Sequence, residues 1–344
     1  MKNKKYICLF ILFIALNIIN IKLAFPKKFT SNVIQSNDTL SITDIDFSDN
    51  KVYLCVNFKE IFVSSDYGDS WSKLNFPFSR ENNYSISQLE IYEKIILAYH
   101  MDGTLLISTD VGKCWMIDSF FKDLNIANNN DVEKNIWINN VRIINNTIYV
   151  CTNKGLYHKN HKNNCWETYP SLPAVNLFDI QFINNVYYFL SEIGLFLYSK
   201  IDKKIDEIST FRIYDGKNVY SLLVNNNILY VSADSGVFCS TNSGIKWSNI
   251  TKNLDIPEAE FDDVLTLFSF KNKIYIKSVN GLYIYNDLSE FWDKIYFKRL
   301  LENYREYWST SSSAKYLFLG SQSGDLYSST DGLNFIPIEI HLSY

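Results

Sequence analysis

The densest group of acidic residues in the chain is a short run that contains Glu258, Glu260, Asp262 and Asp263. Glycoside hydrolysis needs two carboxyl groups facing each other across the scissile bond, roughly 5 to 9.5 Å apart. A second carboxylate would come from a turn elsewhere in the chain, such as Asp102, Glu192 or Asp234. The run is therefore a candidate catalytic group. The alternative is a solvated loop, which is the commoner role of clustered charges.

A second group mixes aromatic and cationic side chains in the connection between residues 293 and 308. Its members are Lys298, Arg299, Tyr304, Arg305 and Trp308. Tyr, Trp and Arg are enriched where proteins bind partners, and long connections are often functional. The segment predicts a surface for a protein or glycan, or else a short helix packed on its neighbours. A similarly long connection spans residues 119 to 136.

Two cysteines and two histidines near residue 160 are of the residue types that bind zinc. They are Cys151, His158, His161 and Cys165. We expect the two cysteines on alternate strands of one sheet, about 9.5 Å apart, which is too far for a disulfide and does not converge four ligands. The sequence therefore predicts free buried thiols, with Cys55 equivalent to Cys151, and neither a metal nor another cofactor.

Short aromatic-aliphatic segments recur along the chain and imply the elements that hold these groups. They end near Tyr53, Ile96, Tyr149, Tyr188, Tyr230, Tyr275 and Phe318. A glycine soon after opens another strand in most copies, as at Gly155, Gly194, Gly236 and Gly281. Asn pairs mark the preceding turn, at Asn145-Asn146, Asn184-Asn185 and Asn225-Asn226, because Asn tolerates the left-handed region. Four strands in each repeat of about 40 to 45 residues predict an all-β protein, a seven-bladed β-propeller of four-stranded antiparallel blades.

A Ser-x-Asp-x-Gly-x-x-Trp pattern stands between the third and fourth strands of several repeats. Two copies match it fully: Ser64, Asp66, Gly68 and Trp71, and Ser108, Asp110, Gly112 and Trp115. Ser240, Asn242, Gly244 and Trp247 match with Asn for Asp, and Ser329, Asp331, Gly332 and Phe335 match with one residue deleted and Phe for Trp. Remnants are Trp166, Asp287 and Trp292. We expect the hydroxyl and carboxylate to bond the turn's backbone, the glycine to adopt positive φ and the aromatic ring to pack between blades.

This pattern resembles the Asp-box, or BNR, repeat of sialidases, two-propeller xyloglucanases, the sortilin luminal domain and Ycf48-like photosystem assembly factors. The resemblance covers residues 39 to 341. In those families the box lies opposite the ligand site, which implies a structural role for these residues. Arg212 stands in a Phe-Arg-Ile-Tyr segment similar to the sialidase Phe-Arg-Ile-Pro motif. It follows two boxes where the family motif precedes the first, so we favour a solvated loop arginine.

Residues 1 to 24 have the features of an export signal, because a lysine cluster precedes an apolar stretch, Tyr6 to Ile21, that is short for a membrane span. Cleavage would follow Ala24, although Lys22 stands where a small residue is preferred. An uncleaved membrane anchor is the alternative. Residues 25 to 38 would form an N-terminal extension, and residues 39 to 344 the propeller.

The formal net charge of −4 argues against a nucleic-acid partner, because neutralising phosphates needs a basic surface. We therefore expect a secreted, periplasmic or luminal non-catalytic propeller that engages a protein or glycan through its loop face. The alternatives are a glycoside hydrolase of the sialidase-like or xyloglucanase-like sort and a structural subunit of an envelope complex. A hydrolase would bring two acidic side chains, or three arginines, into one pocket.

Overall fold

Seven four-stranded antiparallel sheets, here called blades 1 to 7, form the described part of the chain. The computed structural model describes residues 40–75, 86–100, 103–127, 135–160, 164–169, 172, 174–199, 204–208, 219–254, 266–278, 281–296, 308–321, 323–340 and 342–343. The chain divides into two units, Met1–Asp38 and Thr39–Tyr344, and all of these residues belong to the second.

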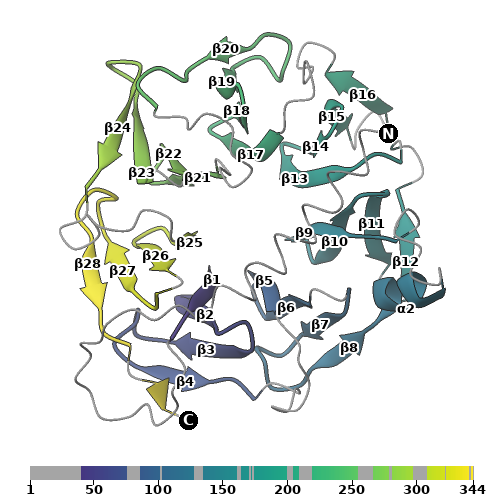
Figure 1. Ribbon diagram of the computed structural model, residues 1–344. Helices are drawn as coiled ribbons and strands as arrows, with labels where there is room; N and C mark the ends of the chain where they lie inside the picture. The colour runs from purple at the N-terminus through teal and green to yellow at the C-terminus, as the bar shows by residue number, and fades with distance from the viewer. Residues whose placement is uncertain are drawn as a thin grey trace, which may run out of the picture. The chain divides into compact units, whose positions relative to one another are not determined.

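Consecutive strands make each blade, and the first strand of each lies nearest the centre of the ring (Figure 1). Blade 1 holds β1 (Ile42–Ser48), β2 (Lys51–Val56), β3 (Glu60–Ser64) and β4 (Trp71–Lys73). Blade 2 holds β5 (Ile86–Tyr92), β6 (Ile95–His100), β7 (Leu105–Ser108) and β8 (Met116–Asp118). Blade 3 holds β9 (Ile138–Ile144), β10 (Thr147–Thr152), β11 (Gly155–Asn160) and β12 (Cys165–Thr168).

The remaining blades repeat this order, which confirms the predicted seven-bladed β-propeller. Blade 4 holds β13 (Leu177–Ile183), β14 (Val186–Ser191), β15 (Gly194–Ser199) and β16 (Lys204–Ile208). Blade 5 holds β17 (Val219–Asn225), β18 (Ile228–Ala233), β19 (Gly236–Ser240) and β20 (Ser248–Asn249). Blade 6 holds β21 (Thr266–Phe270), β22 (Lys273–Ser278), β23 (Gly281–Asn286) and β24 (Phe291–Ile295). Blade 7 holds β25 (Trp308–Ser312), β26 (Leu317–Ser321), β27 (Leu326–Ser329) and β28 (Ile336–Ile338).

The aromatic segments that revealed the repeat are the second strands of the blades. After their first residue, β2, β10, β14 and β18 are buried throughout. Neighbouring blades cover both faces of these strands, which is why they read as continuous apolar runs. Between blades 1 and 7, for example, Ile42 and Ile45 pack with Phe318 and Leu326.

Tight turns join the first two strands of the blades. Asn145 and Asn146 have φ values of 50° and 61°, as expected for a two-residue hairpin turn. In blade 5 the turn lies one residue later than predicted, at Asn226 and Asn227, because Asn225 still pairs with Ile228 in the ladder.

The ring is closed by an element that the sequence did not predict. A short strand, β29 (Leu342–Ser343), pairs in parallel with β4, with Leu342 opposite Trp71. The C-terminus thereby covers the outer edge of blade 1, an edge that would otherwise present unpaired backbone groups.

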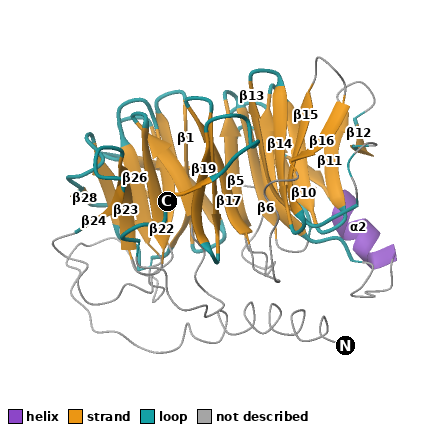
Figure 2. Cartoon of the chain, turned by 90° about the horizontal axis from the view of Figure 1, so that it is seen from above, coloured by secondary structure: helices purple, strands orange, loops and turns teal. Residues whose placement is uncertain are grey.

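Alternating strand direction gives the ring two different faces. The turns after the first and third strands form one face, here called the turn face. The turns after the second strands, and the connections between blades, form the other, here called the loop face. The helix α2 (Phe120–Ala127) lies in the connection from blade 2 to blade 3, at the edge opposite the row of short turns (Figure 2). Its Phe121 is buried against Leu97 and Ile136.

Candidate functional site

On the turn face, the Ser-x-Asp-x-Gly turns satisfy their own polar groups. The Ser64 hydroxyl donates to Asp66 Oδ1 at 2.7 Å and accepts the Gly68 amide at 2.7 Å. The Trp71 indole donates to the Gly68 carbonyl at 3.1 Å. Gly68 has a φ of 107°, and an added Cβ would lie 3.0 Å from Ile338 of blade 7, so the turn needs glycine for its backbone and for close packing.

The other copies of this turn repeat the same bonds. In each copy the serine hydroxyl accepts the glycine amide: that of Gly112 at 2.8 Å, Gly244 at 2.8 Å and Gly332 at 2.8 Å. Hydrogen bonds from the Ser70 and Ser64 hydroxyls lower the pKa of Asp66 to about 2. These polar side chains are thus committed to the turn, which leaves them no free group for chemistry.

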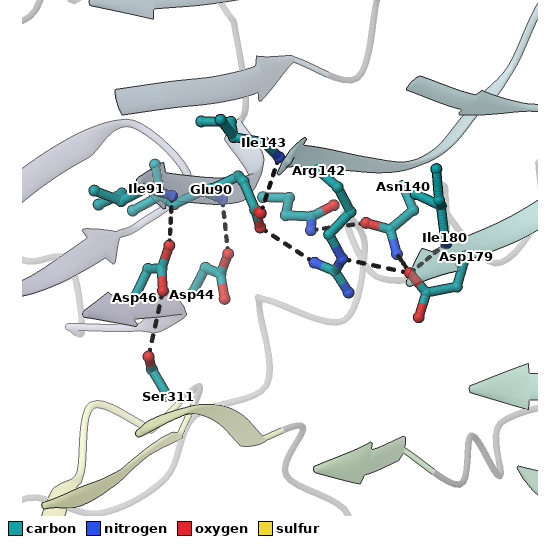
Figure 3. A network of polar contacts seen from close by, with 12 residues as sticks. Asp44, Asp46, Glu90, Ile91, Asn140, Arg142, Ile143, Asp179, Ile180 and Ser311 are labelled. Atoms are coloured by element: carbon teal, nitrogen blue, oxygen red, sulfur yellow. Dashed lines mark hydrogen bonds and ion pairs between the residues drawn. The ribbon is translucent and has the colours of Figure 1, made fainter. Parts of the chain in front are cut away.

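At the centre of the ring, the first strands of blades 1 to 4 carry polar side chains at equivalent positions (Figure 3). We call them the axial polar network: Asp44, Asp46, Gln88, Glu90, Asn140, Arg142, Asp179 and Gln181. The two positions in each strand are two residues apart, so both side chains point to the same side. A register shift precedes the first position in each of blades 1 to 4, and such bulges re-aim the side chains that follow.

The acidic members of the network bond the backbone of the following blade. Asp44 Oδ2 accepts the Leu89 amide at 2.7 Å, and Asp46 Oδ2 accepts the Ile91 amide at 2.6 Å. Glu90 Oε1 accepts the Ile143 amide at 3.1 Å. These bonds join blade 1 to blade 2 and blade 2 to blade 3.

Arg142 connects the acids of the blades on either side of it. Its Nη1 lies 3.2 Å from Glu90 Oε2, and its Nε lies 3.4 Å from Asp179 Oδ1 (Figure 3). Asn140 donates to the same Asp179 oxygen at 2.9 Å and accepts from Gln88 at 3.1 Å. The network therefore runs without a break from blade 2 to blade 4.

Burial shifts the ionisation of the network, and neighbouring charges modify the shift. Burial raises the pKa of Asp44 to about 6. Burial and the nearby Glu90 raise the pKa of Asp46 well above its ordinary value. Burial also raises the pKa of Glu90, against the pull of Arg142. Glu90 and Arg142 keep 19% and 29% of their side chains exposed, so solvent reaches the network and screens part of these effects.

The same positions in blades 5 to 7 are less polar. Ser221 accepts the Leu267 amide of blade 6 at 3.2 Å, and Ser311 donates to Asp46 at 3.3 Å. Leu223 and Phe268 stand opposite Tyr230 and Tyr275, where Asp46 stands opposite Tyr53 in blade 1. Among the first strands that the structure describes, those of blades 1 to 4 thus carry the charged side chains of the axis. Lys277, on the second strand of blade 6, lies close enough to Asp44 to influence it.

On the loop face, two exposed apolar side chains lie on the neighbouring blades 3 and 4. The Trp137 amide donates to Asn153 Oδ1 at 2.8 Å, and Trp137 is 37% exposed. Ile193, in the turn after β14, is 49% exposed. Polar residues next to them in the sequence join the two blades: Asn139 donates to Asn176 Oδ1 at 2.7 Å, and the Asn176 amide donates to Glu192 at 3.2 Å. We call Trp137, Asn139, Asn176, Glu192 and Ile193 the loop-face patch.

Most of the candidate residues from the sequence lie outside the described part of the chain. These are Asp102, His161, Arg212, Glu258, Glu260, Asp262, Asp263, Lys298, Arg299, Tyr304 and Arg305. Trp308 begins β25. Of the proposed partner carboxylates, Glu192 and Asp234 are in loop-face turns, and Asp234 accepts a hydrogen bond from Tyr220.

The five cysteines in the described part of the chain carry unbridged thiols, and only some of them are buried. Cys55 and Cys151 lie at buried, equivalent positions on second strands, as predicted. Cys114 and Cys165 are exposed, so the expectation of buried thiols is wrong for these two. Both precede a Trp at the outer edge of a blade, where side chains alternate toward solvent. Among the described side chains, no group of three or more His, Cys, Asp or Glu could hold a metal ion.

The axial polar network was missed in the sequence, although it left a signal there. Polar residues two apart precede each hairpin turn of blades 1 to 4, as in Asp44 and Asp46. On a single strand this alternation is typical of a solvated face, and only its recurrence at one position of the repeat points to the axis.

In the ranges that the structure describes, no helix is long and apolar enough to span a bilayer.

Comparisons with known proteins support the fold and go no further. No protein-family model and no curated protein matches the sequence. A solved structure of Ycf48 bound to a D1 peptide is similar with a TM-score of 0.59 and 13% identity, covering 86% of this chain and 95% of that one. Virginiamycin B lyase from Staphylococcus aureus is similar with a TM-score of 0.61 and 11% identity, covering 86% and 97%.

PorZ, a bacterial surface component of the type-IX secretion system of Porphyromonas gingivalis, is similar with a TM-score of 0.61 and 15% identity. The match covers 89% of this chain and 39% of PorZ, so this chain spans well under half of that protein. A peptide-bound protein, a lyase and a secretion component thus share one architecture. At these identities the likeness shows only that this chain folds as a β-propeller.

Proposed function

We propose that this protein is an exported binding propeller that engages a protein partner through its loop face. The observation that carries the proposal is the loop-face patch, where Trp137 and Ile193 are exposed beside a row of amide and carboxylate groups. An exposed Trp flanked by polar groups is a common anchor at protein interfaces. On the turn face, by contrast, the polar atoms of the Ser-x-Asp-x-Gly turns bond their own backbone, so exposed apolar residues there, such as Ile245, stand beside polar groups that are already engaged.

The axial polar network favours a scaffolding role over acid-base catalysis. Asp44, Asp46 and Glu90 each accept a backbone amide from the next blade, and Arg142 is shared between two carboxylates. A catalytic carboxyl group must be free to exchange its proton with substrate. We therefore assign these residues to holding the blades together.

Several finer assignments belong to the same proposal. We infer that residues 1 to 24 direct export, with residues 25 to 38 as an extension, and that the Ser-x-Asp-x-Gly turns are Asp-boxes. A glycan partner and the glycoside hydrolase alternative stay predictions, because Arg212 and the acidic run at 258 to 263 lie outside the described residues. Three structural neighbours support the choice of a binding role: Ycf48 bound to a D1 peptide, PorZ, and the extracellular domain of the one component system BT4673 of B. thetaiotaomicron.

Site-specific photocrosslinking tests the proposal. A photoreactive amino acid is placed at Trp137 or Ile193 on the loop face and, as the matched control, at Ile245 in a turn-face loop, which is 64% exposed. We expect discrete protein adducts, identified by mass spectrometry, from the two loop-face positions in cells that express the chain. Adducts from Ile245 alone, or no adduct from either loop-face position, would contradict the proposal. A parallel glycan array tests the glycan alternative.

A further inference from the structure

The junction between blades 1 and 2 concentrates acidic groups in one place. Asp44 and Asp46 project from β1, and Glu90 projects from the facing β5. The amides of Leu89 and Ile91 fix both aspartates against blade 2 at 2.7 Å and 2.6 Å. Three carboxyl groups are therefore held close together by bonds that also hold the ring together.

Positive charge at this junction is scarce. Arg142 pairs with Glu90 and Asp179 on the side away from blade 1. Lys277 lies close enough to lower the pKa of Asp44, and its own pKa is lowered by burial to about 8. Among the described residues, the titratable groups linked to this junction by their electrostatic influence on one another are Asp44, Asp46, Tyr53, Cys55, Glu90, Arg142, Cys151, Asp179 and Lys277.

We propose that this junction is an acid-tightened clasp: Asp44, Asp46 and Glu90 take up protons in mildly acidic surroundings, and the ring gains stability as they do. At neutral pH the like charges repel one another across β1 and β5. A protonated carboxyl group keeps an oxygen that accepts the Leu89 or Ile91 amide, so the bonds between the blades survive while the repulsion disappears.

The sign follows from the direction of the shifts. The pKa of Asp44 is raised to about 6 in the folded chain, so the folded state binds the proton more tightly than the unfolded state. Stability therefore rises as the pH falls through 6 and is lost again as the pH rises. Asp44 alone would change the folding equilibrium about tenfold between pH 7.5 and pH 5.0, with Asp46 and Glu90 adding to it.

Two other groups with shifted pKa values change little in this window. Lys277, with a pKa of about 8, has taken up most of its proton by pH 7.5. Asp66 titrates near pH 2, well below the window. The interval from pH 7.5 to pH 5.0 therefore isolates the clasp from these two contributions.

Chemical unfolding of the propeller at several pH values, together with hydrogen exchange, tests the clasp. We expect the wild-type midpoint to rise between pH 7.5 and 5.0, and the Leu89 and Ile91 amides to exchange about tenfold more slowly at pH 5.0 after correction for intrinsic rates. The D44N/D46N double variant should be more stable than wild type at pH 7.5 and should lose most of the pH dependence, because Asn keeps the acceptor oxygen without the charge. The control variant D66N, on the turn face, should keep the wild-type pH dependence of the unfolding midpoint between pH 7.5 and 5.0.

A wild-type midpoint that is flat or falls toward pH 5.0 would overturn the proposal, as would an unchanged slope in D44N/D46N. If the double variant does not fold, the exchange rates of Leu89 and Ile91 in the wild-type protein decide alone. The clasp does not depend on a partner, so this result is independent of the proposed function.

Discussion

The turn face and the loop face of this ring are joined by the same strands, yet they use polar residues in opposite ways. On the turn face, short turns such as residues 65–70 bond their own backbone through Ser64 and Asp66. On the loop face, the described parts of the connections differ from blade to blade, since residues 120–127 form a helix whereas residues 250–254 do not. Rigid scaffolds with variable loops on one side are a common way to build binding sites. The turn face therefore stabilises the fold, and we propose that the loop face carries the function.

Replacing a tryptophan on each face gives the largest expected contrast. Trp71→Ala removes a side chain that is 3% exposed and packed between blades 1 and 7, so we expect a loss of about 3 to 5 kcal/mol in the free energy of unfolding. Trp137→Ala on the loop face should cost less than about 1 kcal/mol, because that ring is partly exposed. Denaturant unfolding of both variants measures the difference. Equal losses would mean that the loop face is as structural as the turn face.

Removing one hydroxyl group from a turn on the turn face should lower the free energy of unfolding by less than the tryptophan replacement does. The Ser64 side chain is buried and accepts the Gly68 amide, which Ser64→Ala would leave without its partner. We expect a loss of about 1 to 3 kcal/mol for this unsatisfied donor. The exposed Ser72→Ala is the matched control and should change stability by less than about 0.5 kcal/mol. Thermal unfolding measures both variants. Equal stability of the two variants would show that the Ser64 hydroxyl does not stabilise the turn.

Acid should weaken the turn face in a pH range below that of the clasp. Hydrogen bonds from Ser70 and Ser64 lower the pKa of Asp66 to about 2, so its contribution to stability is present above the unfolded value near 4 and is lost as the pH falls toward 2. Asp66→Asn should flatten the fall in unfolding midpoint between pH 5 and 2. Asn242→Asp, which installs the acid in blade 5, should steepen it. The reverse pattern would show that these carboxylates do not stabilise their turns.

The smallest expected effect is a gain in stability at a strained turn residue. Val111 is β-branched and has a φ of 63°, where Asn is better tolerated. Val111→Asn should stabilise the chain by about 0.5 to 1 kcal/mol, whereas Val111→Ile should bring no gain. Differential scanning calorimetry measures both midpoints. A lower midpoint for Val111→Asn would indicate that the valine side chain packs well enough to outweigh its backbone strain.

The fold could be predicted from the sequence because each repeat carries local patterns: an apolar second strand and a glycine that opens the third strand. The second strands are buried on both faces and carry Tyr53 and its equivalents, and Gly155 or Gly194 opens the next strand as expected. The closing strand β29 was missed because two residues paired in parallel with a distant strand leave no local pattern. Ring closure depends on long-range geometry that spacing alone does not encode.

The site was predicted less well than the fold. The axial polar network escaped notice because Asp44 and Asp46 alternate with apolar residues, as they would on a solvated strand. Their burial comes from the neighbouring blades, which a single repeat does not reveal. Exposed Cys114 and Cys165 show the same limit, because position within the blade and not residue type decides their burial.

Binding through the loop face can be tested by hydrogen-deuterium exchange of the purified chain, alone and with the purified partner that crosslinking identifies. We expect slower exchange on binding in the loop-face segments 136–139, 153–154 and 192–194. We expect no change in the turn-face segments 65–70, 109–114 and 241–246. Protection confined to the turn-face segments would contradict the claim that the loop face is the one that engages the partner.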